Sequence, residues 1–303
     1  MAANKNPKQE PQEKLQAKIK EKSIQPITDI ESLLKKGKKA GMPEDLKPML
    51  ATLVGEPFSD PEWVYEVKWD GYRTIAYLNG NTVDLRSRNN KSFTEKYYSI
   101  TEALEGLNLN AVIDGEIVVL NNKGASDFSS LQNWRSEADG ELVFYAFDLL
   151  WYKERNLMGL PLTERHAILE QIFLTDDDRL RISNVFTTNG IEFFEAAKQI
   201  GLEGIIAKKS DSIYNPDVRT KEWLKIKADK RQEVVIGGFT RNEDSSKPFS
   251  SLLLGVYRGK EFHYVGKVGT GFSVKNQKEM MAAFQPLIIK ETAFTREPDV
   301  NKS

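Results

Sequence analysis

The sequence predicts an α+β protein with two folded domains, and three observations support this. Apolar runs of strand length alternate with amphipathic helical stretches from Trp63 to about Lys227. Hydrophobic residues make up 40% of the 303 positions and include five Trp and fifteen Phe, which is enough for sizeable cores. Beyond 229–232 the pattern changes to short strands with Gly-rich corners and one helix, which predicts a second and smaller domain.

These changes divide the chain into three segments. Residues 1–40 are rich in Lys, Gln and Glu, and are expected to form a flexible tail or linker that ends in a short helix over Asp29–Lys36. Residues 41–229 form the first domain and residues 230–303 the second. Prolines between Met42 and Pro61 predict irregular chain that wraps the first domain.

Strands of the first domain are predicted where β-branched and aromatic residues alternate or run together. They are expected at Trp63–Lys68, Arg73–Leu78, Thr82–Arg86, Ala111–Leu120 and Glu141–Trp151. Asn79-Gly80-Asn81 supplies a hairpin turn between the second and third of these strands. Apolar residues recur every three or four positions in three further segments, which predicts helices there. These segments are Ser92–Glu105, Thr163–Phe173 and Ile191–Ile200.

The second domain is predicted to contain three strands and a helix. The strands are Glu233–Thr240, Ser251–Tyr257 and Glu261–Lys267, and the helix is Val274–Phe284. Short strands with glycine corners suit a small β-barrel of the oligonucleotide-binding (OB) kind. Three strands make this barrel short, so we expect it to be incomplete.

Composition narrows the function classes. No apolar run is long enough to cross a bilayer, and the Lys-rich N-terminus lacks the apolar block of a signal peptide, so no membrane partner is expected. The absence of Cys excludes disulfides and thiolate zinc sites, and it fits a reducing cytoplasm. His166 and His263 lie too far apart in sequence to suggest a His-rich metal site. Because the net charge is −1, nucleic-acid binding must depend on local basic clusters on the surface. The candidates are Arg86-Ser87-Arg88, Lys208-Lys209, Arg219–Lys221 and Lys225–Arg231, which could also be solvated faces balanced by nearby acids.

The most informative stretch runs from Glu66 to Arg73. It places Lys68 at the end of a predicted strand and just before an Asp-Gly turn, with Arg73 close behind. An amine, a carboxylate and a guanidinium brought together by a turn could attack, orient and grip a phosphate. Taken alone, however, the same residues would suit an ordinary surface hairpin.

Four further motifs follow in a fixed order. They are Asp114-Gly115-Glu116, Phe144-Tyr145-Ala146-Phe147-Asp148, the segment from Glu203 to Lys209, and Trp223-Leu224-Lys225-Ile226-Lys227. Together with the Lys68 motif, this set resembles the covalent nucleotidyltransferase superfamily of ATP-dependent DNA ligases, RNA ligases and mRNA capping enzymes. The second domain is similar to the ligase module of bacterial ligase D. That similarity lies in Gly237–Thr240, Leu252–Tyr257 and Tyr264–Phe272, and the whole resemblance covers about residues 42 to 290.

The resemblance implies that Lys68 is the nucleophile that attacks the α-phosphorus of ATP. A lysine with an ordinary pKa of about 10.4 is protonated at neutral pH, so its site must lower that pKa. A divalent metal and the side chains of Lys225 and Lys227 are the expected sources of positive charge, which would also stabilise the phosphates. Two positions apart on a strand, these lysines point the same way. The alternative is that they form the exposed side of a half-buried strand.

Two glutamates are the implied acidic partners. The resemblance places Glu116 near the ribose or the metal, and Glu203 near the metal. Carboxylate oxygens suit Mg²⁺ (or Mn²⁺), which usually takes one or two of them and keeps water and phosphate oxygens for the rest. Asp70 and Asp148 are expected to be structural or orienting residues.

The remaining implied residues bind the nucleotide. Phe147 is expected to stack on the adenine, although its apolar neighbours also suit plain core packing. Glu66 is expected beside the purine edge. Arg73 would hold the ribose, and Arg88 would contact the nucleotide or the nick phosphate, because a guanidinium can grip two oxygens at once.

The resemblance therefore implies a nucleotidyltransferase (adenylation) domain with antiparallel sheets and flanking helices, followed by an OB-fold domain. The expected activity is ATP-dependent sealing of nicks in double-stranded DNA through lysyl-AMP and DNA-adenylate, in repair or end joining. A Ku-type end-binding partner and a location at the bacterial nucleoid, in the cytoplasm, are also implied. The family's C-terminal basic motif, which orients pyrophosphate, is not found before Ser303. Two alternatives stay open: a nick-binding module with weak or no self-adenylylation, and an RNA ligase or capping-type nucleotidyltransferase.

Overall fold

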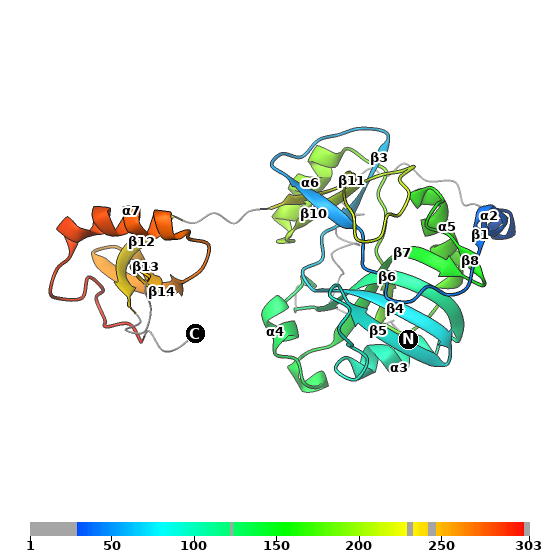
Figure 1. Ribbon diagram of the computed structural model, residues 1–303, viewed down its shortest axis with the longest axis horizontal. Helices are drawn as coiled ribbons and strands as arrows, with labels where there is room; N and C mark the ends of the chain where they lie inside the picture. Colours follow the sequence, from blue (N-terminus) through cyan, green and yellow to red (C-terminus); the bar gives the residue numbers. More distant parts are fainter. Residues whose placement is uncertain (1–28, 122–123, 229–232, 242–246, 300–303) are drawn as a thin grey trace, which may run out of the picture. The chain divides into compact units, whose positions relative to one another are not determined.

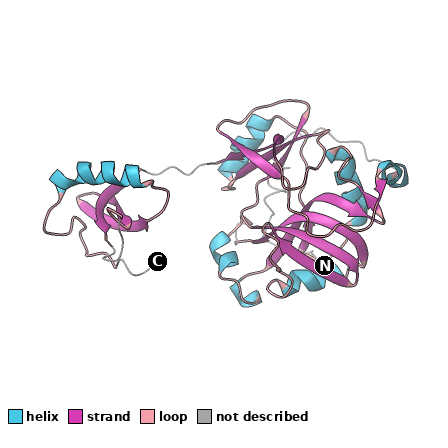
Figure 2. Ribbon diagram, viewed as in Figure 1, coloured by secondary structure: helices cyan, strands magenta, loops and turns pink. Residues whose placement is uncertain are grey.

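The computed structural model describes residues 29–121, 124–228, 233–241 and 247–299. The chain divides between residues 229 and 230 into two compact units (Figure 1). The first contains two sheets with helices around them, and the second contains one small sheet with a single α-helix (Figure 2). Most of the predicted tail, residues 1–28, lies outside the described residues.

The larger sheet of the first unit has the order β1-β8-β7-β6-β4-β5, with β9 beside β7. Its strands are β1 (Lys38–Lys39), β4 (Tyr72–Gly80), β5 (Thr82–Ser87), β6 (Leu109–Val119), β7 (Leu142–Tyr152), β8 (Arg155–Asn156) and β9 (Leu180–Ile182). Neighbouring strands are antiparallel except β7 and β9. The predicted hairpin is confirmed: Asn79 pairs with Thr82, and Gly80 takes the positive φ of 60° that this turn requires.

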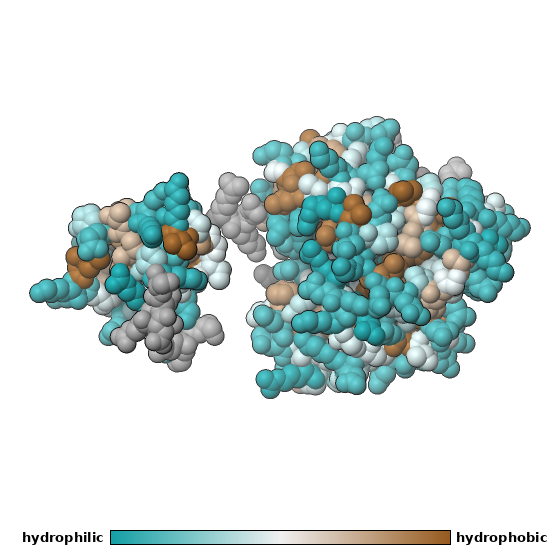
Figure 3. Space-filling view, in the orientation of Figure 1, coloured by the Kyte–Doolittle hydropathy of each residue, from teal (hydrophilic) through white to brown (hydrophobic). Residues whose placement is uncertain are grey.

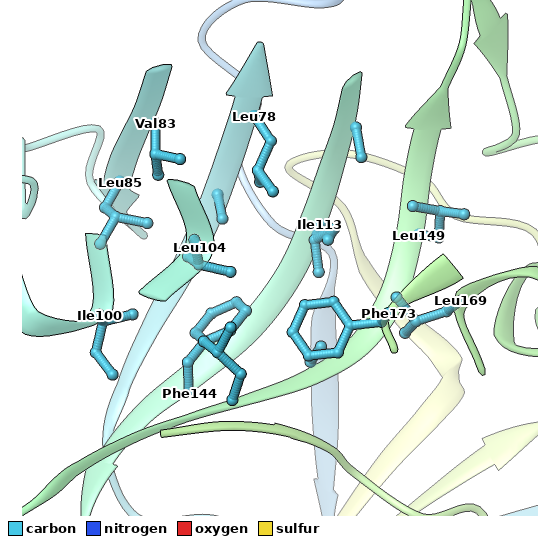
Figure 4. Packing of buried hydrophobic residues seen from close by; sticks show 14 of the residues in the cluster. Leu78, Val83, Leu85, Ile100, Leu104, Ile113, Phe144, Leu149, Leu169 and Phe173 are labelled. Carbon is cyan, nitrogen blue, oxygen red and sulfur yellow. The ribbon is translucent and has the colours of Figure 1, made fainter. Parts of the chain in front are cut away.

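Every residue of β7 is buried, which explains why its residues are apolar on both faces, with Asp148 as the charged exception. Helices α3 (Tyr98–Glu105) and α5 (Leu162–Ile172) contribute buried residues to the core on one face of the large sheet. Figure 4 shows leucine, isoleucine and phenylalanine side chains from strands and helices meeting there. Among them are Leu78, Ile113, Phe144, Leu149, Ile100, Leu104, Leu169 and Phe173.

The smaller sheet has the order β2-β11-β10-β3. Its strands are β2 (Leu50–Val54), β3 (Trp63–Val67), β10 (Gly204–Lys209) and β11 (Arg219–Lys227). Helix α6 (Gly190–Gln199) packs against β10 and β3, and Asn189 caps its first turn by accepting hydrogen bonds from two backbone amides. Gly204 is required at its position, since a Cβ there would lie 2.0 Å from the Ile226 carbonyl oxygen. The backbone at Glu203 can therefore approach β11 closely.

Three details of the first unit differ from expectation. Strand β2 lies inside the segment predicted to be irregular, because parallel pairing with β11 satisfies its backbone groups. The helix predicted from Ser92 begins only at Tyr98, because the preceding residues pair or turn back towards β5. The flexible tail does not reach residue 40. Helix α2 (Ile30–Lys36) buries Leu33 and Leu34 in the large core, and β1 pairs with β8.

The second unit contains β12 (Val235–Thr240), β13 (Ser251–Arg258) and β14 (Glu261–Val268) in one antiparallel sheet, with α7 (Val274–Phe284) after them. Within the described residues this sheet is open, so the predicted barrel does not close. Its core is small and centres on Leu253, Phe262 and Phe294. Three strands cannot supply the strand tilt and stagger that closure needs.

Shorter elements complete the two units. Helix α4 (Phe128–Gln132) and a 3₁₀ turn (Glu137–Asp139) follow β6, and a second 3₁₀ turn (Gln285–Leu287) follows α7. On the face drawn in Figure 3, hydrophilic side chains predominate and apolar ones are scattered. Among the described helices, none has the length and apolar character needed to span a membrane.

Candidate active site

A pocket of about 170 Å³ in the first unit is lined by residues from both of its sheets. It brings together seven of the side chains singled out in the sequence, which lie up to about 160 positions apart. They are Lys68, Glu66, Arg73, Arg88, Glu116, Phe147 and Lys225. The sequence motifs therefore converge on one cavity.

Lys68 lies directly after β3, where its backbone amide donates to the carbonyl of Gly204 at 3.1 Å. This bond ties the lysine to the start of β10. Its side chain is only 17% exposed, and its ammonium forms an ion pair with Oε2 of Glu203. The other carboxylate oxygen of Glu203 accepts from Lys227 at 3.1 Å. Glu203 and Lys227 do not line the pocket but lie beside it. Glu203 holds the amine of Lys68 in place, and Lys227 holds Glu203.

Lys225 lies close to several positively charged side chains. Its pKa is lowered by burial and by the positive charges of Arg219, Lys68, Lys227 and Arg88. Positive groups gathered at one end of a pocket repel one another until an anion arrives, and a phosphate chain is an anion of suitable charge. Arg219 lines the pocket as well, although sequence analysis considered it only as part of a basic cluster.

Glu116 projects from β6 opposite Arg73 on β4. Burial raises the pKa of Glu116 to about 7, even though the charges of Arg73 and Lys68 act to lower it. A further cation beside this carboxylate would offset the cost of burying its charge. The described residues contain no group of three or more His, Asp or Glu side chains able to hold a metal.

Arg73 is fixed by Asp114, a fully buried carboxylate of the neighbouring strand. Nε and one terminal nitrogen of Arg73 each donate to a separate oxygen of Asp114 at 2.6 Å. The guanidinium carbon lies 4.4 Å from the centre of the Phe147 ring. A guanidinium held at two points in this way presents its remaining edge in a defined direction.

Phe147 belongs both to the core and to the pocket wall. It is 7% exposed and packs in a core cluster with Trp223, yet it lines the cavity. Both alternatives raised from the sequence are therefore compatible with its position. Asp148, the next residue, faces away from the cavity and forms a fully buried ion pair with Arg165, which agrees with the structural role expected for it.

Sequence analysis missed the role of Lys208. It was counted among surface basic residues, but it is buried and its ammonium lies 2.6 Å from Oε1 of Glu66. The ammonium also lies 4.6 Å from the ring centre of Phe147 and 4.3 Å from that of Trp223. Ile206, two residues earlier on β10, pairs with Glu66 across the sheet, so Lys208 is a diagonal neighbour on the same face. Only knowledge of this strand register could have revealed the pair.

Removing the amine from this pair is expected to destabilise the protein. Lys208→Met would leave the Glu66 carboxylate buried without its partner, which costs about 3 kcal/mol of unfolding free energy. Urea denaturation measures this loss. Lys209→Met is the matched control, because the neighbouring lysine makes only long contacts at 3.6 and 4.0 Å with exposed carboxylates. Equal stability of the two variants would contradict an energetically important pair.

His166 provides a pH-dependent contribution to stability. Its Nε2 lies 3.1 Å from the carbonyl oxygen of Ser183, and its Nδ1 lies 3.4 Å from the carboxylate of Glu170. Both partners are acceptors, so the doubly protonated ring satisfies both. Burial lowers the pKa of His166, but Glu170 and Glu66 outweigh burial and leave the pKa above its ordinary value of 6.5.

A raised pKa in the folded state means that the contribution of His166 is complete below pH 6.5 and is lost as the pH rises through the folded value. His166→Gln is therefore expected to lower the free energy of unfolding more at about pH 6 than at about pH 8.5. Denaturation curves of both proteins at the two pH values test this. A difference that stays constant, or widens at high pH, would contradict a charged imidazole.

Family models match both units of the chain. The ATP dependent DNA ligase domain matches residues 48–227, and the ATP dependent DNA ligase C terminal region matches residues 245–303. The chain belongs to the ATP-dependent DNA ligases. Members of this family are enzymes.

Individual ligases show the same relationship. The multifunctional non-homologous end joining protein LigD of Pseudomonas aeruginosa is 37% identical over 275 residues, which cover 89% of this chain and 32% of that protein. DNA ligase C of Mycobacterium tuberculosis is 31% identical over 270 residues, which cover 84% of this chain and 73% of that protein. This ligase-family chain thus spans about a third of the length of the LigD proteins that it matches.

Solved structures also match. Mycobacterial DNA ligase D complexed with ATP and MES is similar with a TM-score of 0.59 and 33% identity, over 85% of this chain and 84% of that one. The ligase domain of M. tuberculosis LigD matches with a TM-score of 0.57 and 34% identity. The predicted similarity to the ligase D branch is confirmed, and so is the nucleotidyltransferase-type ligase fold.

Proposed function

We propose that this chain seals nicks in double-stranded DNA, with ATP as the adenylate donor and Lys68 as the nucleophile. One observation carries the proposal: Lys68 lines the pocket with its amine paired to Glu203, and the cations Arg88, Arg219 and Lys225 line the same cavity. An amine fixed at the wall of a cavity that is lined with cations is placed to attack an electrophilic phosphorus bound there. The same cations suit the triphosphate that such a lysine would attack.

In the first step, Nζ of Lys68 attacks the α-phosphorus of ATP. A P–N bond forms, the bond to the pyrophosphate oxygen breaks, and pyrophosphate leaves with the bonding electrons. The proton lost from Nζ passes to water, because Glu203 is assigned to the metal. Lys225, Lys227, Arg88 and Arg219 would stabilise negative charge on the phosphates. Glu116 and Glu203 would hold Mg²⁺ or Mn²⁺, which supplies further positive charge to those oxygens.

The later steps transfer the adenylate. The 5′-phosphate of a nick attacks the phosphorus on Lys68 and forms DNA-adenylate, which releases the amine. The neighbouring 3′-hydroxyl then attacks that phosphate and displaces AMP, so the strand is closed. Binding of the duplex would depend mainly on contacts between basic side chains and its phosphates.

The pocket also supports roles for the other predicted residues. Phe147 would stack on adenine, with Glu66 near the purine edge, and Arg73 would bind the ribose. Arg88 would contact the nucleotide or the nick phosphate. These roles agree with the location of all four side chains in the wall of one cavity.

The biological setting is proposed from the relatives. Several LigD proteins are named for non-homologous end joining, which supports a role of this chain in DNA repair and end joining. A Ku-type end-binding partner and a place at the bacterial nucleoid are part of the same proposal.

Intact-mass measurement after incubation with ATP and Mg²⁺ tests the activity. The proposal predicts a single AMP adduct, which disappears when nicked DNA is added as the nick is sealed. Nicked RNA and GTP are offered in parallel. Preference for either would favour an RNA ligase or capping-type enzyme, and nick binding without any adduct would favour a binding module instead.

A further inference from the structure

The hydroxyl of Tyr214 lies at the centre of a buried hydrogen-bond chain behind the pocket. Tyr214 belongs to the loop between β10 and β11 and is only 3% exposed. Its hydroxyl donates to Oδ2 of Asp114 at 2.5 Å and accepts from the backbone amide of Met49 at 3.0 Å. It therefore joins three segments that are far apart in the sequence.

The first branch of this chain leads to Arg73. Both oxygens of Asp114 accept from the Arg73 guanidinium, and Oδ2 accepts from Tyr214 as well. Asp114 is fully buried, so each donor matters to its orientation. In this branch Tyr214 does not bond to Arg73 itself. It restrains the Asp114 carboxylate, which in turn orients Arg73 in the pocket wall.

The second branch leads to the segment just before β2, which Arg73 also reaches, since one of its terminal nitrogens donates to the Met49 carbonyl at 3.5 Å. Met49, whose amide bonds to Tyr214, directly precedes Leu50 and Ala51, which line the pocket. The next amide, that of Leu50, donates to the carbonyl of Val218 in the same loop as Tyr214. The loop thus anchors the start of β2, and one hydroxyl bonds both Asp114, which holds Arg73, and the backbone just before Leu50.

The protonation state of the hydroxyl suits this task. Burial, together with the nearby charge of Asp114, raises the pKa of Tyr214 well above its ordinary value of 10.0. The phenol therefore keeps its proton and remains a donor to the carboxylate over the whole physiological range. The edge of its ring also packs against Trp223, which restricts the ring to one position.

We propose that Tyr214 is a positioning residue for nucleotide binding. Its hydroxyl sets the distance between Arg73 and the Leu50–Ala51 wall, and so keeps the cavity in the shape that receives ATP. The inference rests on the proposed ligase activity, because it assigns to this pocket the nucleotide of that reaction. Tyr214 bonds neither Lys68 nor Glu203, so it affects binding of ATP rather than the chemical step.

Tyr214→Phe and a matched control test this role. The variant removes one oxygen and keeps the ring. Tyr77→Phe is the control, because the Tyr77 hydroxyl also accepts a backbone amide, that of Leu46 at 2.7 Å, in the same segment before β2. Neither Tyr77 nor Leu46 lines the pocket. The rate of AMP adduct formation is measured for wild type and both variants against ATP concentration.

Tyr214→Phe is expected to raise the half-saturating ATP concentration about tenfold, the size expected for one lost hydrogen bond to a charged group. Its maximal rate is expected to stay within about twofold of wild type, and Tyr77→Phe is expected to match wild type in both values. Equal ATP dependence of the two variants, or a lower maximal rate at unchanged ATP dependence, would overturn the positioning role.

A second measurement separates this inference from the proposed function. The rise in melting temperature caused by ATP needs no turnover and compares each variant with itself, so a general loss of stability does not affect it. A smaller rise in Tyr214→Phe than in Tyr77→Phe supports the role of the hydroxyl, and equal rises overturn it. Failure of the wild type to form an adduct would instead refute the ligase activity, and the melting data would still decide the role of Tyr214.

Discussion

Lys68→Ala is expected to form no AMP adduct with ATP and Mg²⁺ and to lose nick sealing completely. The amine is the only atom of that side chain able to form the P–N bond, and methyl cannot replace it. Lys68→Arg is expected to behave in the same way, because a guanidinium stays protonated and is not a nucleophile at neutral pH. Intact mass reports the adduct, and a labelled nicked duplex reports sealing.

Lys221→Ala is a suitable control for the loss of a lysine. Lys221 is exposed on β11, the strand that also carries Lys225 and Lys227, but it does not line the pocket. Its variant should form the adduct at the wild-type rate. An adduct that persists in Lys68→Ala would show that another residue is the nucleophile, and the proposed mechanism would then be wrong.

Arg165→Ala is expected to cause the largest loss of stability among the substitutions considered. Arg165 and Asp148 are both fully buried, and two guanidinium nitrogens donate to the carboxylate at 2.7 and 2.8 Å. A third nitrogen donates to the backbone carbonyls of Leu160 and Ser212. Truncation would leave the buried charge of Asp148 and two buried carbonyls without their hydrogen-bond donor, which costs about 5 kcal/mol of unfolding free energy. Urea or thermal denaturation checks this value.

Arg179→Ala serves as the comparison for this prediction. Arg179 also grips a carboxylate with a bidentate contact, that of Asp177, but both side chains are about one third exposed. Water can solvate either group after truncation, so the expected loss is about 1 kcal/mol or less. If the two variants lost the same free energy, burial would not be what makes the Arg165 pair important.

Many elements of the first unit could be predicted from periodicity. The strands that became β3 to β7 and the helices α5 and α6 occur within one or two residues of their expected limits. Their patterns were clear because each buries one face or both. Strand β2 was missed because its formation depends on β11, which lies about 170 positions away. A strand that owes its existence to a distant partner leaves only a weak local pattern.

In the second unit, the strands could be predicted from the sequence but the closure of the sheet could not. Its three strands and its helix were expected close to where they occur. Whether a sheet curls and closes depends on the number of strands, their tilt and their stagger, which no single strand specifies. The open sheet of β12, β13 and β14 therefore could not be told from a short barrel by reading local patterns.

In the candidate site, ordered motifs identified Lys68, Glu116 and Lys225, because local sequence places each of them on a strand beside a characteristic neighbour. The role of Lys208 could not be predicted, because its pairing with Glu66 depends on the register between β10 and β3. Tyr214 escaped notice for a similar reason, since its partners Asp114 and Met49 come from other strands and loops.

The amino-acid order alone identified the family and most of the secondary structure, and it predicted which lysine is the nucleophile, because these depend on residue type and short-range spacing. Folding in three dimensions established how charges are paired: Lys68 with Glu203, Lys208 with Glu66, and Arg73 with Asp114, which also accepts from Tyr214. An ion pair forms only when register, strand order and burial bring two groups within a few ångströms. Those long-range conditions belong to the packed molecule and are not expressed in any local segment of its chain.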